Sequence, residues 1–598
     1  MSDQAYLIRE AVAERIVELS DQRLINLMLG FPEVERANVE LLRMTGVRRF
    51  FPDQAAFRQF REVLKSPSGE ETQREYGDYQ TPAQLADKVC AYLRSRGLEP
   101  EVIIEPTYGG GSFVLAALNH FPEARLIYGV EIQERYEWQL KISLLIRALL
   151  GRHPTAEVEL HCDDIFTHVF SANRTEAKSI LILGNPPWIT SAELSSLQSS
   201  NLPTKTNLKS LNGLDAITGK SNFDIGEYVV LRLLDAFAER GGTLALLCKN
   251  TIIRNVVELL PRRDYKLANM EALTFDAGRE FGVAVEASLF VAELGAQTRS
   301  FTCRVSSLQN PSVQVREFGW VNQRFVSHVA DYANTCEIEG KSPLVWRQGV
   351  KHDCAKVMEL HHANGVWTNG WGETVEVEDD RVYWLLKGSD LQAFEVTQAR
   401  KMVIVTQRSL GEDTAALAAT APRLWSYLTN HGSEFAKRKS SIYRDRAQFA
   451  MFGVGDYSFA PYKVAIAGFY KEPRFALVVP IDDRPVMLDD TAYFLGFDQY
   501  RDALFACTLL NCSIVQRFLK SITFSDAKRP YTKDALMRID VRKVVEQVSF
   551  QTMETIWRDS GYEPREAICE ADFASFRRQL QPIESLRPLP QPVLAFSS

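Results

Sequence analysis

The segment Ile-Leu-Ile-Leu-Gly-Asn-Pro-Pro-Trp at residues 180–188 holds the residue types best suited to chemistry. Its two prolines have fixed φ angles and no N–H, so the local backbone offers acceptors without competing donors. A planar amino group could donate one hydrogen to the Asn185 side-chain oxygen and the other to the Pro186 carbonyl. These acceptors would point the nitrogen lone pair at an incoming methyl group, while Trp188, after Pro187, could lie flat against an aromatic ring. The pattern favours methylation of an exocyclic amine over the alternative, a proline turn with a packed indole.

The apolar run at residues 180–183 is expected to be a buried strand of a parallel sheet. Ligand sites of open α/β sheets lie beyond the carboxyl ends of such strands. Three earlier runs, at residues 102–105, 126–131 and 158–164, have the same apolar pattern and end in acids. Any one of these acids could be a helix N-cap or a loop carboxylate. Four such strand ends in order favour one shared ligand site.

A glycine-rich turn at residues 109–111 follows the first of these runs, and a helix is expected to begin near Ser112. The turn lacks the G-x-G-x-x-G spacing and the lysine of phosphate-binding loops. A zwitterionic methyl donor such as S-adenosylmethionine needs no phosphate cradle. Glu105 would then face its ammonium group, Glu131 the ribose hydroxyls and Asp164 the adenine amino group.

The order of these motifs resembles the amino-methyltransferases that modify DNA, and is similar to their gamma class. The resemblance covers roughly residues 76–295 and includes a Tyr-Gln-Thr-Pro segment at 79–82, the Asn-Pro-Pro-Trp corner and a later motif at 281–290. Glu105 stands where many members carry Asp, and Tyr108 where Cys is frequent. The cofactor residues that the resemblance implies are Tyr79, Gln80, Thr81, Pro82, Glu105, Pro106, Gly109, Gly111, Phe113, Glu131, Ile132, Asp164, Ile165 and Asn185.

The resemblance implies direct transfer of a methyl group from S-adenosylmethionine to N6 of an adenine that is flipped out of double-stranded DNA. Its catalytic residues would be Asn185, Pro186, Pro187 and Trp188, with Phe281 stacking on the second face of the base and Phe275 as the alternative. Other substrates of the same corner stay open, namely cytosine N4, RNA and a protein glutamine. So does a nucleic-acid-binding member without catalysis.

A fused nuclease is not expected, because Glu62 and Lys65 lack the spacing of a metal-dependent nuclease core. The sequence therefore predicts modification without cleavage, and leaves room for a separate restriction endonuclease or other defence-system subunit as a partner. Nine cysteines without C-x-x-C spacing indicate neither a disulfide framework nor a metal site. No apolar run approaches the ~20 residues that span a bilayer, and no signal-peptide pattern is present, so we expect a cytoplasmic protein without membrane contact.

A net charge of −7 argues against a uniformly basic surface, but not against a local basic groove. Two segments that interleave cations with hydroxyls and aromatic residues, at 437–446 and 528–533, are candidates for phosphate contact. Solvated helix faces are the alternative for such runs. The cations that we expect to contact DNA are Lys437, Arg438, Lys439, Arg444, Arg446, Lys463, Lys528 and Arg529.

The predicted fold class is α/β with three parts. Residues 1–75 have helical apolar spacing and should form a helical N-terminal extension. Residues 76–300 alternate strands and helices, which predicts a Rossmann-like methyltransferase domain with a mostly parallel sheet. A polar stretch at 191–222 is expected to be a loop beside the corner. Residues 301–598 carry short β-like runs between helices and suit an α+β target-recognition domain.

Overall fold

The computed structural model describes residues 7, 8, 11, 22–65, 80–189, 224–363 and 365–580, so Tyr79 and the 191–222 loop fall outside the described residues. Two compact units divide between Phe325 and Val326. This division lies beyond the boundary expected at residue 300, because strands β8 (Thr302–Ser307) and β9 (Asn310–Val321) still belong to the sheet of the first unit.

The first unit is built on a ten-stranded sheet in the order β10-β9-β8-β6-β7-β5-β4-β1-β2-β3. The five strands from β1 to β5 run parallel to one another, and β7 runs antiparallel between β5 and β6. The mostly parallel α/β sheet is therefore confirmed. Its remaining strands are β1 (Val102–Glu105), β2 (Leu126–Glu131), β3 (Glu157–Cys162), β4 (Ile180–Gly184), β5 (Gly242–Lys249), β6 (Leu267–Phe275), β7 (Ala287–Leu294) and β10 (Arg324–Val326).

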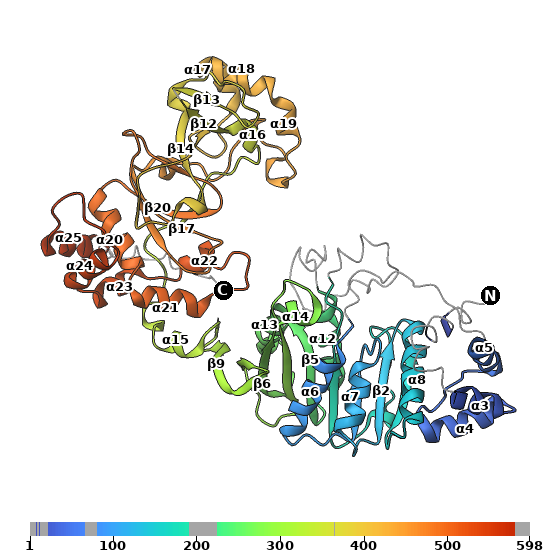
Figure 1. Ribbon diagram of the computed structural model, residues 1–598. Helices are drawn as coiled ribbons and strands as arrows, with labels where there is room; N and C mark the ends of the chain where they lie inside the picture. The colour runs from blue at the N-terminus through green and yellow to red at the C-terminus, as the bar shows by residue number, and fades with distance from the viewer. Residues whose placement is uncertain are drawn as a thin grey trace, which may run out of the picture. The chain divides into compact units, whose positions relative to one another are not determined.

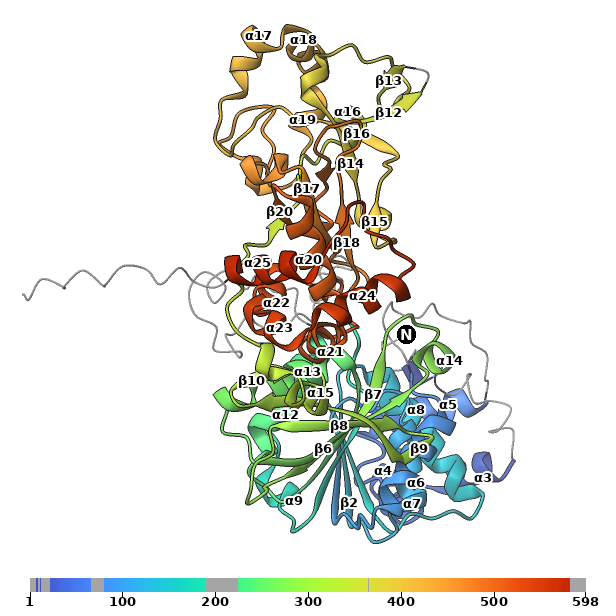
Figure 2. The ribbon, with the colours of Figure 1, turned by 90° about the vertical axis from the view of Figure 1, so that its left-hand side faces the viewer.

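Helices cover both faces of this sheet, as the edge-on view in Figure 2 shows. One face carries α6 (Ala83–Ser95), α7 (Ser112–His120) and α8 (Glu134–Leu149), and the other carries α12 (Ile225–Phe237) and α13 (Asn250–Leu259). Strands β1, β2 and β4 are buried along their whole length, as strands covered on both faces must be. Two short helices, α9 (Ala172–Thr175) and α14 (Ala277–Phe281), complete the unit.

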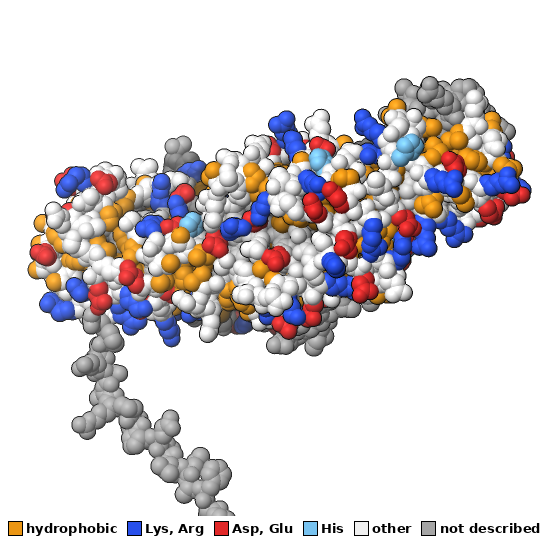
Figure 3. Space-filling model, turned by 90° about the horizontal axis from the view of Figure 1, so that it is seen from below, with side chains coloured by type: hydrophobic (Ala, Val, Ile, Leu, Met, Phe, Trp, Pro, Cys, Tyr) orange, Lys and Arg blue, Asp and Glu red, His pale blue; other side chains and the backbone are white. Residues whose placement is uncertain are grey.

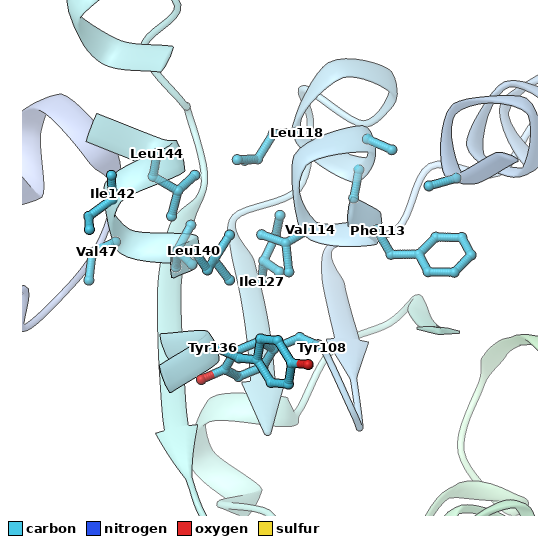
Figure 4. Packing of buried hydrophobic residues seen from close by; sticks show 14 of the residues in the cluster. Val47, Tyr108, Phe113, Val114, Leu118, Ile127, Tyr136, Leu140, Ile142 and Leu144 are labelled. Atoms are coloured by element: carbon cyan, nitrogen blue, oxygen red, sulfur yellow. The ribbon is translucent and has the colours of Figure 1, made fainter. Parts of the chain in front are cut away.

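The expected N-terminal helices are α3 (Gln22–Gly30), α4 (Val34–Thr45) and α5 (Gln54–Lys65). Phe60 of α5 stacks on Trp138 of α8, with ring centroids 6.3 Å apart. Val47 pairs with Val158 in an isolated parallel bridge at the outer edge of β3. Figure 4 shows Val47 beside Ile142 of α8, within the aliphatic cluster that also holds Leu140. The extension therefore belongs to the core of the first unit and covers a sheet edge.

The second unit contains two five-stranded sheets, in the orders β11-β20-β17-β18-β15 and β13-β12-β16-β14-β19. Their strands are β11 (Arg347–Gln348), β12 (Glu359–Ala363), β13 (Val366–Thr368), β14 (Val382–Leu386), β15 (Glu395–Val396), β16 (Lys401–Ile404), β17 (Tyr462–Ala467), β18 (Phe475–Val478), β19 (Met487–Leu488) and β20 (Ala492–Phe497). Because β14 pairs with β16 and β17 with β18, the short β-like runs expected in residues 301–598 include strands that form ladders.

The helices of the second unit, labelled in Figure 1, make it an α+β unit. They are α15 (Val329–Ala333), α16 (Ala355–Met358), α17 (Leu417–Thr420), α18 (Pro422–Asn430), α19 (Gly432–Ala436), α20 (Tyr500–Leu510), α21 (Ser513–Ile522), α22 (Lys533–Leu536), α23 (Val541–Gln547), α24 (Phe550–Asp559) and α25 (Glu570–Leu580). Within the described ranges, no single helix has the length and apolar character to cross a membrane. In the same ranges, α20 and α21 meet those criteria together as a pair bent by 60°, and α20 is buried in the core of its unit.

Charges of both signs are interspersed on the surface drawn in Figure 3, in keeping with 69 basic and 76 acidic residues. A groove for a polyanion must therefore arise from local clustering of cations rather than from net charge.

Candidate active site

The Asn-Pro-Pro-Trp corner lies where the sequence predicts it, directly after the carboxyl end of β4. Strand β4 runs between β1 and β5, with Val102 opposite Ile180 and Leu244 opposite Ile182. The carboxyl ends of the three parallel strands therefore meet at one edge. The Thr107 hydroxyl, two residues beyond β1, donates to the Asn185 carbonyl at 3.3 Å and joins the loops that follow β1 and β4.

The segment at residues 80–82 contacts both the glycine turn and the corner. The backbone N–H of Gly110 donates to Gln80 Oε1 at 2.6 Å. Ser112 Oγ donates to the Thr81 carbonyl at 2.6 Å, while Thr81 Oγ1 accepts from Asn185 Nδ2 at 3.2 Å. Three motifs that are separate in the sequence thus form one hydrogen-bonded cluster.

The glycine turn needs its glycines for conformation and for space. Gly109 and Gly111 have φ angles of +49° and +82°, in the left-handed region that side chains disfavour. A Cβ on Gly109 would lie 2.6 Å from Gln80 Oε1, and one on Gly111 would collide with Leu140. The backbone can therefore approach the 80–82 segment and deliver the chain into α7, whose first residue is Ser112.

Two buried polar atoms near this turn have no hydrogen-bond partner among the described residues, namely Glu105 Oε2 and the Tyr108 hydroxyl. Burial, followed by the nearby charge of Glu131, raises the pKa of Glu105 well above its usual range, although the Val114 N–H donates to this carboxyl. Burial also raises the pKa of Tyr108. A buried carboxylate without a cation is costly, and an incoming ammonium group would satisfy it. These two orphaned atoms therefore fit the amino-acid end of S-adenosylmethionine.

The acids after β2 and β3 shape their own loops. Glu131 accepts from the N–H groups of Gly109 and Gln133, both at 3.0 Å, and so ties β2 to the glycine turn. Each carboxylate oxygen can accept a second hydrogen, which leaves capacity for ribose hydroxyls. Asp164 Oδ1 accepts from the Phe166 N–H at 3.0 Å. The Phe166 ring packs edge-on against Tyr228 of α12, with centroids 4.8 Å apart.

Trp188 and Phe281 are neighbours, although they are 93 residues apart in the sequence. Their ring centroids lie 4.9 Å apart in an edge-to-face arrangement, and Phe275 lies 6.2 Å from Phe281. Trp188 is 7% exposed and its indole N–H donates to the Leu247 carbonyl at 3.3 Å. A base stacked between two rings needs centroids about 7 Å apart, at roughly 3.5 Å per stacked pair. The rings must therefore separate before they can hold a base between them.

Sequence reasoning did not single out an ion pair beside the corner. Lys249, the last residue of β5, lies 2.6 Å from Asp224, whose other oxygen caps α12 at the Gly226 N–H. The Ile225 N–H donates to the Ile189 carbonyl at 2.9 Å, which attaches the start of α12 to the chain that leaves the corner. The signal was present as an acid just before a helical apolar pattern, which marks an N-cap.

Several residues predicted to bind the cofactor differ in their exposure. The Phe113 ring is 1% exposed and packs in the core, as Figure 4 shows, whereas Ile132 is 40% exposed. Ile165 is buried at 7% exposure, next to Asp164. Pro106 lies within 3.3 Å of the space that a Cβ on Gly184 would fill, so the turns after β1 and β4 are in close contact. No set of three or more His, Cys, Asp or Glu residues suited to a metal ion occurs in the described part of the chain.

The cations predicted to contact DNA differ in their exposure. Lys437, Lys439, Arg444, Arg446 and Lys528 are exposed, while Arg529 is partly buried and lies over the Phe469 ring at 4.4 Å. Arg438 donates to the carbonyls of Gln448 and Ala450 and lies 3.8 Å from the Tyr443 ring centroid, so it stabilises its own loop.

Lys463 requires a correction, because it is fully buried in β17 and donates to the Ala460 carbonyl at 2.5 Å. Strand β17 is buried on both faces from Lys463 to Ala467, so a phosphate cannot reach this side chain. Strand β17 begins at Tyr462, so Lys463 lies within the sheet.

No family model matches the chain. The Type II methyltransferase M.NspV of Nostoc sp. (strain ATCC 29411 / PCC 7524) is 36% identical over 474 residues, which cover 79% of this chain and 97% of that protein. Among solved structures, the type IIL restriction-modification enzyme MmeI in complex with DNA gives a TM-score of 0.48 at 11% identity, with 88% of this chain and 80% of that chain covered. The type IIG restriction endonuclease BpuSI gives 0.38 at 12% identity, with 96% and 75% covered.

Both structural likenesses are distant. The assignment depends on M.NspV, because the matched region covers nearly the whole length of that protein. The first unit is consistent with it, because the glycine turn, the buried Glu105 and the corner at Asn185 meet at one edge of a mostly parallel sheet. The chain belongs to the type II DNA methyltransferases, the enzymes of restriction-modification systems that use S-adenosylmethionine as methyl donor.

Proposed function

We propose that this protein methylates N6 of adenine at specific sites in double-stranded DNA, on a base that is flipped into the first unit. The observation that carries the proposal is the hydrogen bond between Asn185 and Thr81, because the neighbouring Gln80 accepts a hydrogen bond from the glycine turn. It supports an amine-binding corner and a cofactor site that share one set of hydrogen bonds. The methyl donor and its acceptor would then be adjacent.

Asn185 and Pro186 would bind the amino group of the target base. Because Asn185 Nδ2 donates to Thr81 Oγ1, the amide is oriented with its oxygen on the opposite side from Thr81. This oxygen and the Pro186 carbonyl would each accept one hydrogen of the amine, and Pro187 adds no competing donor. The lone pair of the amine would then point out of the base plane, toward the cofactor side of the corner.

Glu105, Tyr108 and the glycine turn would hold the cofactor. The carboxylate of Glu105 would bind the ammonium group, while Glu131 and Asp164 would accept from the ribose and from the adenine amino group. S-adenosylmethionine supplies an electrophilic methyl group when it is bound. The protein's contribution is to bind and orient both partners, which accounts for much of the acceleration of a two-substrate reaction.

Trp188 and Phe281 would receive the flipped base. Base flipping costs a few kcal/mol, and stacking returns about 1–3 kcal/mol per base. Since the two ring centroids are 4.9 Å apart, the base would displace the Phe281 ring. Phe281 is the last residue of the short helix α14, directly before Gly282. A left-handed glycine at that position, with φ +71°, provides a turn at which Phe281 could move.

The second unit would recognise the DNA sequence, with its exposed cations at 437–446 and 528 contacting phosphates. Such contacts position DNA and make affinity salt-dependent, but they do not specify a sequence. A restriction endonuclease on a separate chain would cleave the same site when it is unmodified.

The test is single-molecule sequencing of modified bases in genomic DNA from a methylation-free host, with and without this protein. Methyl-adenine at one recurrent motif, abolished by Asn185→Ala, is the expected result. Methylation of cytosine N4 instead would retain the site but refute the choice of base. Modification of RNA or protein alone, by an enzyme that binds the cofactor, would refute the proposed substrate.

A further inference from the structure

A chain of hydrogen bonds joins the loop that follows β3 to the buried strand β2. His168 Nδ1 is 2.8 Å from Asp163 Oδ2, and His168 Nε2 is 2.8 Å from the Tyr128 hydroxyl on β2. His168 and Tyr128 are 5% and 1% exposed. The proposed catalytic residues do not include any of these three side chains.

The surroundings determine which atoms donate. The hydrogen bond with His168 is the main cause that lowers the pKa of Asp163, so this carboxylate accepts from Nδ1–H. Burial raises the pKa of Tyr128 to about 12, so its hydroxyl stays protonated and is able to donate to Nε2. Both ring nitrogens of His168 therefore have a hydrogen-bond partner, Nδ1 in Asp163 and Nε2 in Tyr128.

Other charged groups near the imidazole do not replace these contacts. His161 stacks on Tyr128 with centroids 4.4 Å apart, and is itself paired with Glu159 at 3.1 Å. The Arg232 guanidinium donates to the His168 backbone carbonyl at 3.0 Å rather than to its ring.

The chain of hydrogen bonds continues into the loop that carries Asp164. The other oxygen of Asp163 accepts from the Asp164 N–H at 2.8 Å. The backbone N–H of His168 donates to the Asp164 carbonyl at 2.7 Å. Asp164 is thus held on both sides of its Cα, at its N–H by Asp163 and at its carbonyl by His168.

We propose that His168 is a positioning residue for the cofactor, which fixes the loop so that Asp164 meets the adenine amino group. This inference rests on the proposed contact between Asp164 and the cofactor. It assigns a defined role to each ring nitrogen: Nδ1 holds Asp163 and therefore the loop, whereas Nε2 fixes the ring to β2 through Tyr128.

Two substitutions separate the nitrogens, because an Asn amide can replace Nδ1 and a Gln amide can replace Nε2. The S-adenosylmethionine Kd, measured by calorimetry without DNA, should stay within about twofold of wild type in His168→Asn. It should rise about tenfold in His168→Gln, which keeps the Tyr128 contact but loses Asp163. The kcat at saturating cofactor should be unchanged in both variants. Equal effects of the two substitutions would overturn the proposal, since a merely structural histidine makes no such distinction.

Two further variants distinguish a positioning effect on the Kd from a folding defect. Asp163→Ala alters a side chain that is 48% exposed, so it should fold, and it should also raise the Kd about tenfold. Tyr265→Phe is the control for a lost buried tyrosine bond in the same unit, because the Tyr265 hydroxyl donates to Asp235 at 2.6 Å; it should leave the Kd unchanged. An unchanged Kd in Asp163→Ala would contradict the proposal.

A double-mutant cycle separates this inference from the proposed site itself. If His168 acts through Asp164, then His168→Gln should add less than about twofold to the Kd of Asp164→Ala, instead of a further tenfold. Additive effects would overturn the positioning role. An unchanged Kd in Asp164→Ala alone would refute the assigned adenine contact and, with it, this inference, while the methyl-transfer corner at Asn185 would be unaffected.

Discussion

Glu105→Gln should stabilise the cofactor-free protein and weaken its affinity for S-adenosylmethionine. The Glu105 side chain is 3% exposed, and its Oε2 has no partner within the described residues. Gln has the same shape but no charge, so the substitution removes the cost of an unmatched buried carboxylate. An unsatisfied buried group costs about 1–3 kcal/mol, and we expect the cofactor-free variant to gain stability of that order.

The gain should depend on pH in a defined direction. Because the pKa of Glu105 is raised above its usual range, the folded protein holds this proton more tightly than the unfolded chain does. The wild type therefore loses stability as the pH rises from the ordinary carboxyl range through the raised pKa. The stability advantage of Glu105→Gln should be absent at low pH and should grow over that interval.

Cofactor binding should change in the other direction. A hydrogen bond to a charged group contributes about 1.5–3 kcal/mol, so loss of the ammonium contact should weaken the S-adenosylmethionine Kd roughly 10- to 150-fold. Calorimetry gives the Kd, and thermal unfolding with and without cofactor gives the stabilities. The wild-type affinity should also fall toward low pH as Glu105 becomes protonated, whereas the variant should not share that part of the pH dependence.

Glu271→Gln is the matched control. Glu271 is also buried, but it accepts from Arg96 at 2.8 Å and from Tyr92 at 3.0 Å, and it pairs with Arg304. Its substitution should lower stability with and without cofactor and leave the Kd unchanged. The reasoning about Glu105 would be refuted if Glu105→Gln destabilised the cofactor-free protein as Glu271→Gln does, or if it bound the cofactor like wild type.

Four further results are expected. Asn185→Ala should lower kcat about 10²- to 10³-fold in a methyl-transfer assay while cofactor affinity holds, because it removes an acceptor that acts on the reacting amine; normal turnover would exclude this mechanism. Phe281→Ala should weaken binding of DNA with 2-aminopurine at the target position about 10- to 100-fold, measured by fluorescence. Unchanged binding would show that Phe281 makes no stacking contact. Arg444→Gln should lower the slope of log affinity against log salt by about one, whereas an unchanged slope would place this residue away from phosphates. Burial lowers the pKa of Lys463 to about 7, so protonation destabilises the fold as pH falls from about 10 to 7; Lys463→Met should raise the unfolding temperature at pH 7 and less at pH 10, and the reverse order would contradict this account.

Local patterns in the sequence were sufficient for the elements of the first unit. Residues 126–131 form β2 with the predicted bounds, and the helix expected from Ser112 begins there. Contiguous apolar runs this short can only be satisfied by burial within a covered sheet, and glycines with positive φ mark the turn that follows. The Asn-Pro-Pro-Trp corner could be placed at a strand end for the same reason.

The boundary between the units could not be obtained in this way. The sheet continues past residue 300 because β8 pairs with β6, in parallel, and β9 pairs with β8. Pairing depends on which strand edges meet, and composition carries no information about that. The burial of Lys463 has a similar origin, since tertiary packing covers both faces of β17 from Lys463 to Ala467.

The sequence by itself determined which residues could carry methyl transfer, because the chemistry of an amide next to two prolines and of acids at strand ends is local. The tertiary structure alone decided how they meet. It brings Thr81 to Asn185 across 104 residues, leaves Glu105 Oε2 buried without a partner among the described residues, and joins His168 to Tyr128 across 40 residues. These contacts depend on the packing of parallel strands and their crossover helices, which brings distant loops to one edge of the sheet.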